Sequence, residues 1–168
     1  HYLPLIDPEI DFAARHRADI PCKVLAPEPD FTKLALAKDR YCSSLSLYGI
    51  DSPRTLSRDD IAAGQRGIAK CPGSFGGKAT WPIDSIAQFD ALPPGAFVQE
   101  RLEGSEFTAD CFSQPDGELF VSVRERVEIK SGVCTKARIA PHTGIQYIAE
   151  RLLRGYEIRS PFCFQAMS

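Results

Sequence analysis

The sequence lacks the patterns that mark several common protein classes. It contains no run of about twenty apolar residues that could span a bilayer, and its amino end has neither an initiating Met nor a signal-peptide pattern. Lys and Arg number 20 against 22 Asp and Glu, a formal net charge of −2. Non-specific nucleic-acid binding needs a basic excess, which is absent here. We therefore expect no membrane partner and no nucleic-acid partner.

Zinc-site and disulfide patterns are also missing. The six cysteines form no CxxC pair and have no histidines at zinc-ligand spacing, so we expect reduced thiols and a cytoplasmic protein. Cys71 follows Lys70, whose charge could lower its thiol pKa, but we favour the interpretation that it is a small residue filling space under the loop. His16 and His142 have no evident partner and are expected at the surface.

A glycine-rich loop, KCPGSFGGKAT, is present between Lys70 and Thr80. Glycines let the backbone approach a ligand closely and turn N–H groups toward phosphate oxygens, and the flanking lysines add positive charge. The loop has neither the P-loop ending nor the spacing of the dinucleotide fingerprint. Its flanks predict strand, loop, strand, so an ordinary hairpin turn is the alternative. The residues concerned are Gly73, Ser74, Gly76, Gly77 and Lys78.

A second segment, FVQERLEGSEFTAD, runs from Phe97 to Asp110. A strand leads into a polar stretch, and strand character returns at Phe107, which is typical of a chain crossover. Exposed backbone groups at such a crossover can bind an adenine edge, and a following carboxylate can bind two ribose hydroxyls. The alternative is a surface hairpin with solvated glutamates.

Five segments in this order resemble the ATP-grasp superfamily, in particular carbamoyl phosphate synthetase large chains and related carboxylate–amine ligases. The resemblance covers most of the chain. Its landmarks are ALAKDRYCSSLSLYGIDSPRT from Ala35, IAKCPGSFGGKAT from Ile68, FVQERLEGSEFTAD from Phe97, VEIKSGVCTKARI from Val127, and the closing SPFCFQAMS.

The resemblance implies an α+β fold with two lobes, antiparallel sheets and flanking helices, and it implies ATP and Mg²⁺ as ligands. Lys38, at a helix start, and Lys70 would contact phosphates, with Ser74, Gly76 and Gly77 in the covering loop. Glu100 and Leu102 would lie at the adenine, largely through main-chain groups, and Glu106 would bind the ribose. Gln165 would face magnesium. Lys136 or Arg138 would border the cleft.

The sequence departs from the family at its carboxyl end. In the family a further strand with a pattern like Glu-x-Asn-Pro-Arg ligates magnesium, whereas this sequence stops at Ser168. A lone amide oxygen cannot fix Mg²⁺ well. We therefore expect a fragment: residues 1–29 would be the remnant of a preceding α/β domain, with a helix and a strand, and 30–168 an ATP-grasp domain incomplete at its C-terminal end, lacking the metal-binding strand of the same protein.

Local patterns predict the other elements. A helix is expected over 31–48, with Asp30 as N-cap and Gly49 as its stop. Short helices are expected over 57–63 and 85–92, and a longer one from 142 or 143 to 154. The turn at 114–117 predicts a hairpin between strands 108–112 and 119–123, which continues to 129. A final strand is expected over 162–167.

The expected chemistry belongs to the parent protein. ATP would convert a small-molecule carboxylate to an acylphosphate, and an amine or similar nucleophile would displace phosphate, with lysines and Mg²⁺ stabilising the transferring phosphoryl group. Whether this chain is itself an enzyme stays open. The alternative is a non-catalytic nucleotide-binding module or a fragment without independent activity.

Overall fold

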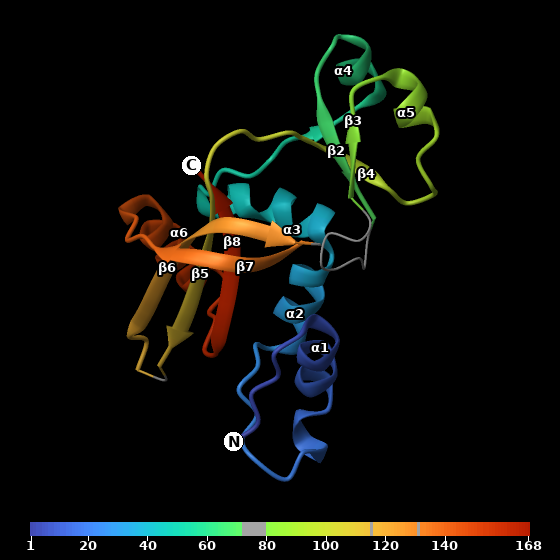
Figure 1. Ribbon diagram of the computed structural model, residues 1–168. Helices are drawn as coiled ribbons and strands as arrows, with labels where there is room; N and C mark the ends of the chain where they lie inside the picture. The colour runs from blue at the N-terminus through green and yellow to red at the C-terminus, as the bar shows by residue number, and fades with distance from the viewer. Residues whose placement is uncertain (72–79, 115, 131) are drawn as a thin grey trace.

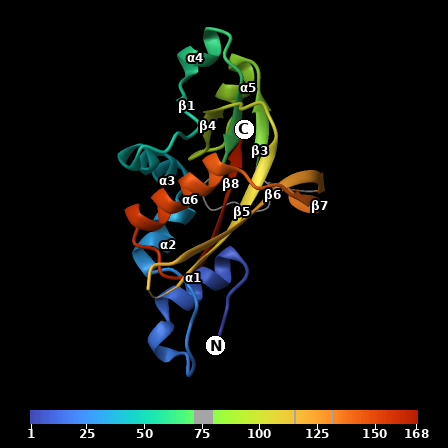
Figure 2. The same cartoon turned by 90° about the vertical axis from the view of Figure 1, so that its left-hand side faces the viewer.

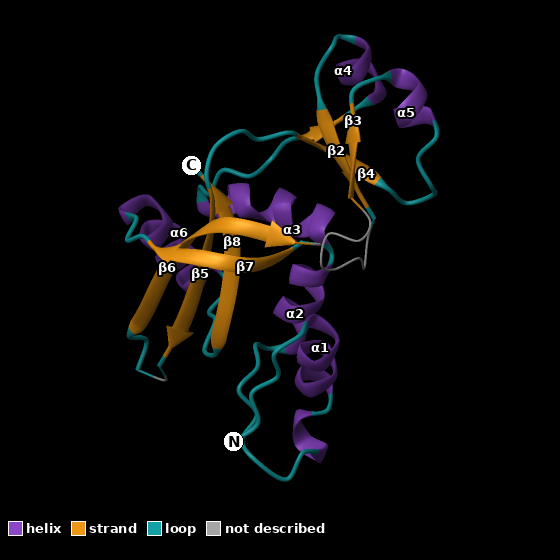
Figure 3. Ribbon diagram, viewed as in Figure 1, coloured by secondary structure: helices purple, strands orange, loops and turns teal. Residues whose placement is uncertain are grey.

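The structure, a computed structural model, describes residues 1–71, 80–114, 116–130 and 132–168 (Figure 1). Two four-stranded antiparallel sheets form two lobes, each with its own helices (Figure 3). The expected α+β class with two lobes and flanking helices is thus confirmed. Within the described ranges, no helix has the length and apolar character needed to cross a membrane.

The amino-terminal part is helical. It contains α1 (Asp7–Arg15), the short 3-10 helix η1 (Arg17–Asp19) and α2 (Pro29–Leu36). The strand expected near Val24 is not formed, because Val24 makes only an isolated parallel bridge with Tyr2. A small cluster around the buried Ala13, Val24 and Ala26 holds this part together.

The helix expected over 31–48 is three helices. Ala37, with φ −86° and ψ 76°, separates α2 from α3 (Lys38–Leu45), and the 3-10 helix η2 (Ser46–Tyr48) follows. The predicted N-cap was wrong: Pro29 opens α2 and Glu28 is the N-cap. Gly49 ends η2 in the left-handed conformation, as expected. The break makes Lys38 the first residue of α3.

The first sheet has the strand order β1-β4-β2-β3. Its strands are β1 (Thr55–Leu56), β2 (Gly67–Lys70), β3 (Thr80–Ile83) and β4 (Phe97–Glu100). Two helices, α4 (Arg58–Ala62) and α5 (Ile86–Asp90), begin where predicted because Ser57 and Ser85 cap their backbone N–H groups. One sheet face packs with these helices in a cluster of Leu56, Ile61, Ala69, Ile83 and Val98.

The second sheet has the order β7-β6-β5-β8. Its strands are β5 (Glu106–Ser113), β6 (Leu119–Lys130), β7 (Val133–Ile139) and β8 (Pro161–Met167), with α6 (Thr143–Gly155) between the last two. The predicted β5–β6 hairpin, the helix near 143–154 and the final strand are confirmed. Helix α6 packs on one face, in a cluster of Phe107, Ala109, Cys111, Val123, Ile145 and Ala149. Figure 2 shows α6 beside α3, and Leu45, Ile50, Leu152 and Ile158 join them.

Each sheet therefore has an apolar face covered by helices and an opposite face available for polar side chains. In β2 and β4, Ala69 and Val98 point into the helix-covered core, so Lys70 and Gln99 lie on the other face. In β5 the buried Phe107 and Ala109 likewise place Glu106 on the opposite face. The two polar faces carry the candidate site.

Candidate functional site

Lys70 ends β2 on the polar face of the first sheet. Its Nζ donates a 2.7 Å hydrogen bond to Oε1 of Gln99 on β4. Gln99 is only 2% exposed, and its Nε2 in turn donates to the carbonyl of Pro53 at 3.4 Å. A buried, hydrogen-bonded amide thus fixes the direction of the lysine, while contributing no negative charge to neutralise it.

Side chains from two other elements, α3 and β5, act on the Lys70 ammonium. Burial is the largest influence and lowers the pKa of Lys70; Cys42 raises it, the positive charge of Lys38 lowers it, and Glu106 raises it. Lys38 and Cys42 lie one turn apart on α3, and Glu106 begins β5. Lys38 and Glu106, two other residues singled out in the sequence, therefore lie within electrostatic range of Lys70.

The segment from Phe97 to Glu106 connects the two sheets, because β4 belongs to the first and β5 to the second. The expected crossover is therefore present (Figure 1). Glu100 does not point freely into solvent: its Oε1 accepts a 2.8 Å hydrogen bond from the amide of Arg54, and its own amide donates to the Arg54 carbonyl at 2.8 Å. Leu102 is 39% exposed in the connecting stretch.

The polar face of the second sheet carries two ion pairs. Arg124 Nε contacts Asp110 at 2.7 Å, and Arg126 pairs with Glu106. The hydrogen bond to Asp110 raises the pKa of the already basic Arg124. Thr108, buried at 7% exposure, lies between the two acidic residues on β5. Both carboxylates of this face are thus already compensated by arginines of the neighbouring strand.

Gln165 lies on the same polar face, since Thr108 and Gln165 are partners in the β5–β8 ladder. Its side chain is exposed. Among the described residues, no group of three or more His, Cys, Asp or Glu side chains could hold a metal ion. These residues do not form a Mg²⁺ site by themselves, because Mg²⁺ requires near-octahedral oxygen coordination.

All the predicted loop residues lie outside the described residues: Gly73, Ser74, Gly76, Gly77 and Lys78. Lys136 and Arg138, on β7, form ion pairs with Glu128 and Glu125 of β6. The hydrogen bond from Arg138 is the main cause that lowers the pKa of the Glu125 carboxyl.

Sequence reasoning missed two residues of this region and misjudged a third. Gln99 carried no signal apart from its place beside Glu100, and Arg126 looked like one of several charges on an ordinary strand face. His142 does have partners: its Nδ1 accepts a 3.3 Å hydrogen bond from the amide of Ile145 and caps α6, and its Nε2 lies 3.2 Å from Ser168 Oγ.

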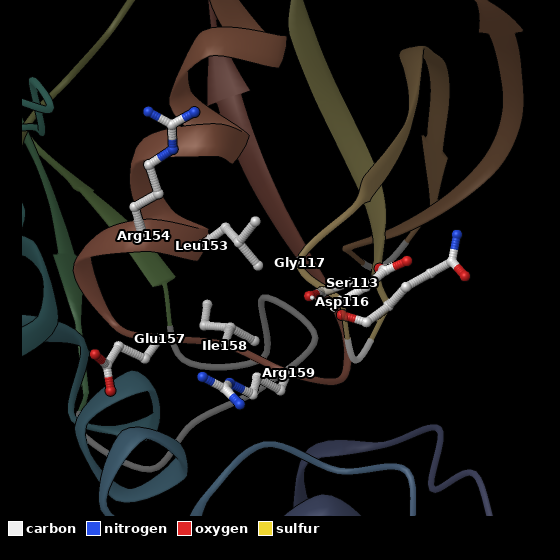
Figure 4. A pocket seen from close by; sticks show the side chains of 9 residues that line it. Ser113, Asp116, Gly117, Leu153, Arg154, Glu157, Ile158 and Arg159 are labelled. Carbon is white, nitrogen blue, oxygen red and sulfur yellow. Dashed lines mark hydrogen bonds between the residues drawn. The ribbon is translucent and has the colours of Figure 1, made fainter.

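Two surface pockets occur elsewhere in the described structure. The first, of about 250 Å³, lies between the β5–β6 hairpin end and the C-terminal end of α6 (Figure 4). Leu153 and Ile158 border it on one side and Ser113, Asp116 and Gly117 on the other. The second lies along α6, beside Tyr48 and Arg151. Neither pocket is lined by a described residue of the predicted nucleotide site.

Neither a protein-family model nor a curated protein matches the chain by sequence. Its fold is similar to solved structures of ATP-grasp enzymes. One is N5-carboxyaminoimidazole ribonucleotide synthetase from Thermus thermophilus, with a TM-score of 0.79 and 12% identity, covering 99% of this chain and 50% of that chain. Another is D-alanyl-alanine synthetase A from Vibrio cholerae, with a TM-score of 0.69 and 13% identity, covering 86% and 55%.

A third similar structure is the biotin carboxylase domain of Hydrogenobacter thermophilus 2-oxoglutarate carboxylase, solved with MgADP, ADP and bicarbonate. Its TM-score is 0.74 at 11% identity, covering 92% of this chain and 41% of that chain. The chain spans about half the length of these enzymes. The ATP-grasp fold is thus confirmed, and these identities are too low to assign a reaction.

Proposed function

We propose that this chain is the ATP-binding part of an ATP-grasp ligase that activates a small-molecule carboxylate as an acylphosphate for attack by an amine or similar nucleophile. The observation that carries the proposal is that Lys70, held by Gln99 on the polar face of the first sheet, lies within electrostatic range of Lys38 on α3 and Glu106 on β5. Solved structures with this fold contain ATP in one enzyme and MgADP in another.

In this proposal the first sheet binds the phosphates. Lys70 meets a neutral amide, and the nearby charge of Lys38 adds to the positive potential around its ammonium. Two partly buried cations close to each other favour a polyanion, because its charge relieves their mutual repulsion and their desolvation. The same cations would stabilise charge on a phosphoryl group during transfer, which is where phosphoryl-transfer enzymes gain most of their acceleration.

The crossover and the second sheet would bind the nucleoside. Within the described residues, the amide of Leu102 takes part in no backbone hydrogen bond, so it is available to an adenine edge. Glu106 starts the next strand, and a carboxylate offers acceptors to two ribose hydroxyls. The glycine loop with Ser74, Gly76 and Gly77 would cover the phosphates.

Mg²⁺ would be bound together with the nucleotide. Mg²⁺ is usually held by one or two carboxylates plus substrate phosphates. Gln165 would supply one oxygen from the polar face of the second sheet, and the remaining ligands would come from phosphate, water and groups outside the described residues. When bound, the ion supplies charge neutralisation at the phosphates.

The finer points of the proposal concern the whole protein. We propose that it belongs to the carbamoyl phosphate synthetase-like branch and is cytoplasmic. Residues 1–29 would be the remnant of a preceding domain and 30–168 an ATP-grasp domain. A C-terminal segment of the same protein would complete the metal site. Bicarbonate in one similar structure and 5-aminoimidazole ribonucleotide in another support a carboxylate and an amine as the reacting partners.

Calorimetric titration of the 168-residue chain with Mg-ATP tests the proposal. We expect weak binding that Lys70→Ala reduces by about tenfold or more, because a hydrogen bond to a charged group contributes about 1.5–3 kcal/mol. Lys130→Ala is the matched control, since Lys130 is an exposed lysine at the end of β6. It removes the same charge and should leave the affinity unchanged.

Circular dichroism spectra of both variants should match the wild type, so that lost binding is not lost folding. Equal losses in the two variants would contradict the placement of the phosphates at Lys70. Absence of any Mg-ATP binding by the folded wild-type chain would contradict the proposed function.

A further inference from the structure

Arg126 is a buried cation on the polar face of the second sheet and is not among the site residues expected from the sequence. Its side chain is 5% exposed. Nη1 pairs with the Glu106 carboxylate, and Nη2 donates a 2.9 Å hydrogen bond to the carbonyl of Gly132. Its Nε is buried without a hydrogen-bond partner. Burying a guanidinium with an unsatisfied N–H costs free energy. The contacts with Glu106 and Gly132 offset that cost.

The β5–β6 ladder places Arg126 directly opposite Glu106. Phe107 pairs with Glu125, so the preceding residue of β5 faces the following residue of β6. On its other side Arg126 faces Ala137 of β7. The Gly132 carbonyl, in the turn between β6 and β7, anchors the far end of the guanidinium. The carboxylate of Glu106 is therefore held by a guanidinium that is itself anchored at its other end by the Gly132 carbonyl.

We infer that Arg126 is a positioning residue of the nucleotide site: it orients the Glu106 carboxylate to accept hydrogen bonds from the two vicinal hydroxyls of the ribose. The inference rests on the proposed function. An ionised carboxylate has about four lone-pair sites on two oxygens. The ion pair engages Oε1, and the remaining sites suit a pair of hydroxyls.

The chain contains a matched comparison for this role. Arg124 lies two residues earlier on the same strand and the same face, and it pairs with Asp110 of β5. Its side chain is 34% exposed against 5% for Arg126. Replacing Arg124 removes the same charge from the same sheet without removing the partner of Glu106.

The test compares calorimetric affinities for Mg-ATP and for 2′,3′-dideoxy-ATP, which lacks both hydroxyls. We expect the wild-type chain to prefer ATP by about tenfold. Arg126→Gln should reduce this preference to about twofold or less, as should Glu106→Gln, and the double variant should lose no more than either single variant. Arg124→Gln should keep the wild-type preference.

Arg126→Lys provides a second variant, because it keeps the charge but lacks the planar fork that holds a carboxylate. The preference of this variant for ATP over the dideoxy nucleotide should be about threefold smaller than that of the wild type. This variant decides the question if Arg126→Gln does not fold. A folded Arg126 variant that keeps the full preference overturns the inference. So does an equal loss of affinity for both nucleotides, which would mean that Arg126 acts on the phosphates.

The two proposals fail in different ways. A wild-type chain that binds both nucleotides equally overturns the role of Arg126 and leaves ATP binding intact. A folded wild-type chain that binds neither nucleotide overturns the proposed function, and the positioning role falls with it.

Discussion

The two sheets are built alike but treat charge differently. Both are antiparallel, both bury one face under helices, and both turn a polar face toward the candidate site. On the first sheet the cation Lys70 meets the neutral amide of Gln99 by hydrogen bond. On the polar face of the second sheet both carboxylates have an arginine, with Glu106 paired to Arg126 and Asp110 paired to Arg124.

This difference assigns complementary tasks to the two lobes. A cation that is held by a neutral amide and lies near a second cation attracts an anion. A carboxylate paired with an arginine adds little net charge, but it still offers oriented hydrogen-bond acceptors. A ligand with phosphates at one end and hydroxyls at the other matches this arrangement. The comparison can be tested first in the cores, then at the lysine, and finally through pH.

The largest effects are expected in the two cores. Ile83 in the first lobe and Ile145 in the second are each 2% exposed. Replacement of either by alanine should lower the free energy of unfolding by about 3 kcal/mol, because it removes buried methyl groups and leaves a cavity. The measurement is urea unfolding followed by far-UV circular dichroism.

Trp81 is the single tryptophan and lies on β3 of the first sheet, so its fluorescence reports on the unfolding of the first lobe. The two core clusters share no residue. Ile83→Ala should therefore shift the unfolding midpoint seen by Trp81 fluorescence, while Ile145→Ala should leave that midpoint in place. A common shift would mean that the lobes unfold as one unit. Ile139→Ala, at 69% exposure, is the control, with an expected change within about 0.5 kcal/mol.

Sequence patterns predicted most of the architecture and gave several candidate residues for the site. Periodicity and turn residues placed most of the strands, but not β1 or β7. The capped helices were placed because Ser57 and Ser85 act locally. The break at Ala37 could not be predicted, because its neighbours are good helix formers and no local residue marks a stop. Packing between α2, α3 and α6 overrides that propensity.

For the candidate site too, local sequence motifs were informative, whereas interactions between distant segments could not be predicted. Lys38, Lys70 and Glu106 could be proposed as site residues because they stand in recognisable motifs in a fixed order. Gln99 and Arg126 could not, because a polar residue in a strand becomes informative only when the register shows its partner. Gln99 is recognised by its hydrogen bond to Lys70 on β2, and Arg126 by its ion pair with Glu106 on β5.

Gln99→Glu would make the first sheet resemble the second by giving Lys70 a charged partner. The new carboxylate would lie within hydrogen-bond distance of Nζ, would raise the pKa of Lys70, and would compete with phosphate. We expect Mg-ATP affinity to fall by about tenfold, in line with the strength of a charge-assisted hydrogen bond. The measurement is calorimetric titration at pH 7.

Gln88→Glu is the control for the added charge. Gln88 lies on the exposed surface of α5, where its Oε1 accepts a hydrogen bond from the amide of Asp84. A glutamate can accept the same bond, so the fold is preserved and the net charge changes equally. The explanation through Lys70 would be untenable if both variants lost affinity to the same degree.

The smallest effect is a pH dependence of nucleotide binding. Burial lowers the pKa of Lys70 in the free chain, and bound phosphate favours the charged ammonium and raises the pKa again. Affinity should therefore be constant at pH values below the lowered pKa and should decline above it, because binding then requires proton uptake. The decline approaches tenfold per pH unit between the free and bound pKa values, and Lys70→Arg should abolish it since arginine stays charged. Titrations from pH 7 to 10 measure it, and an unchanged decline in Lys70→Arg would assign the titrating group elsewhere.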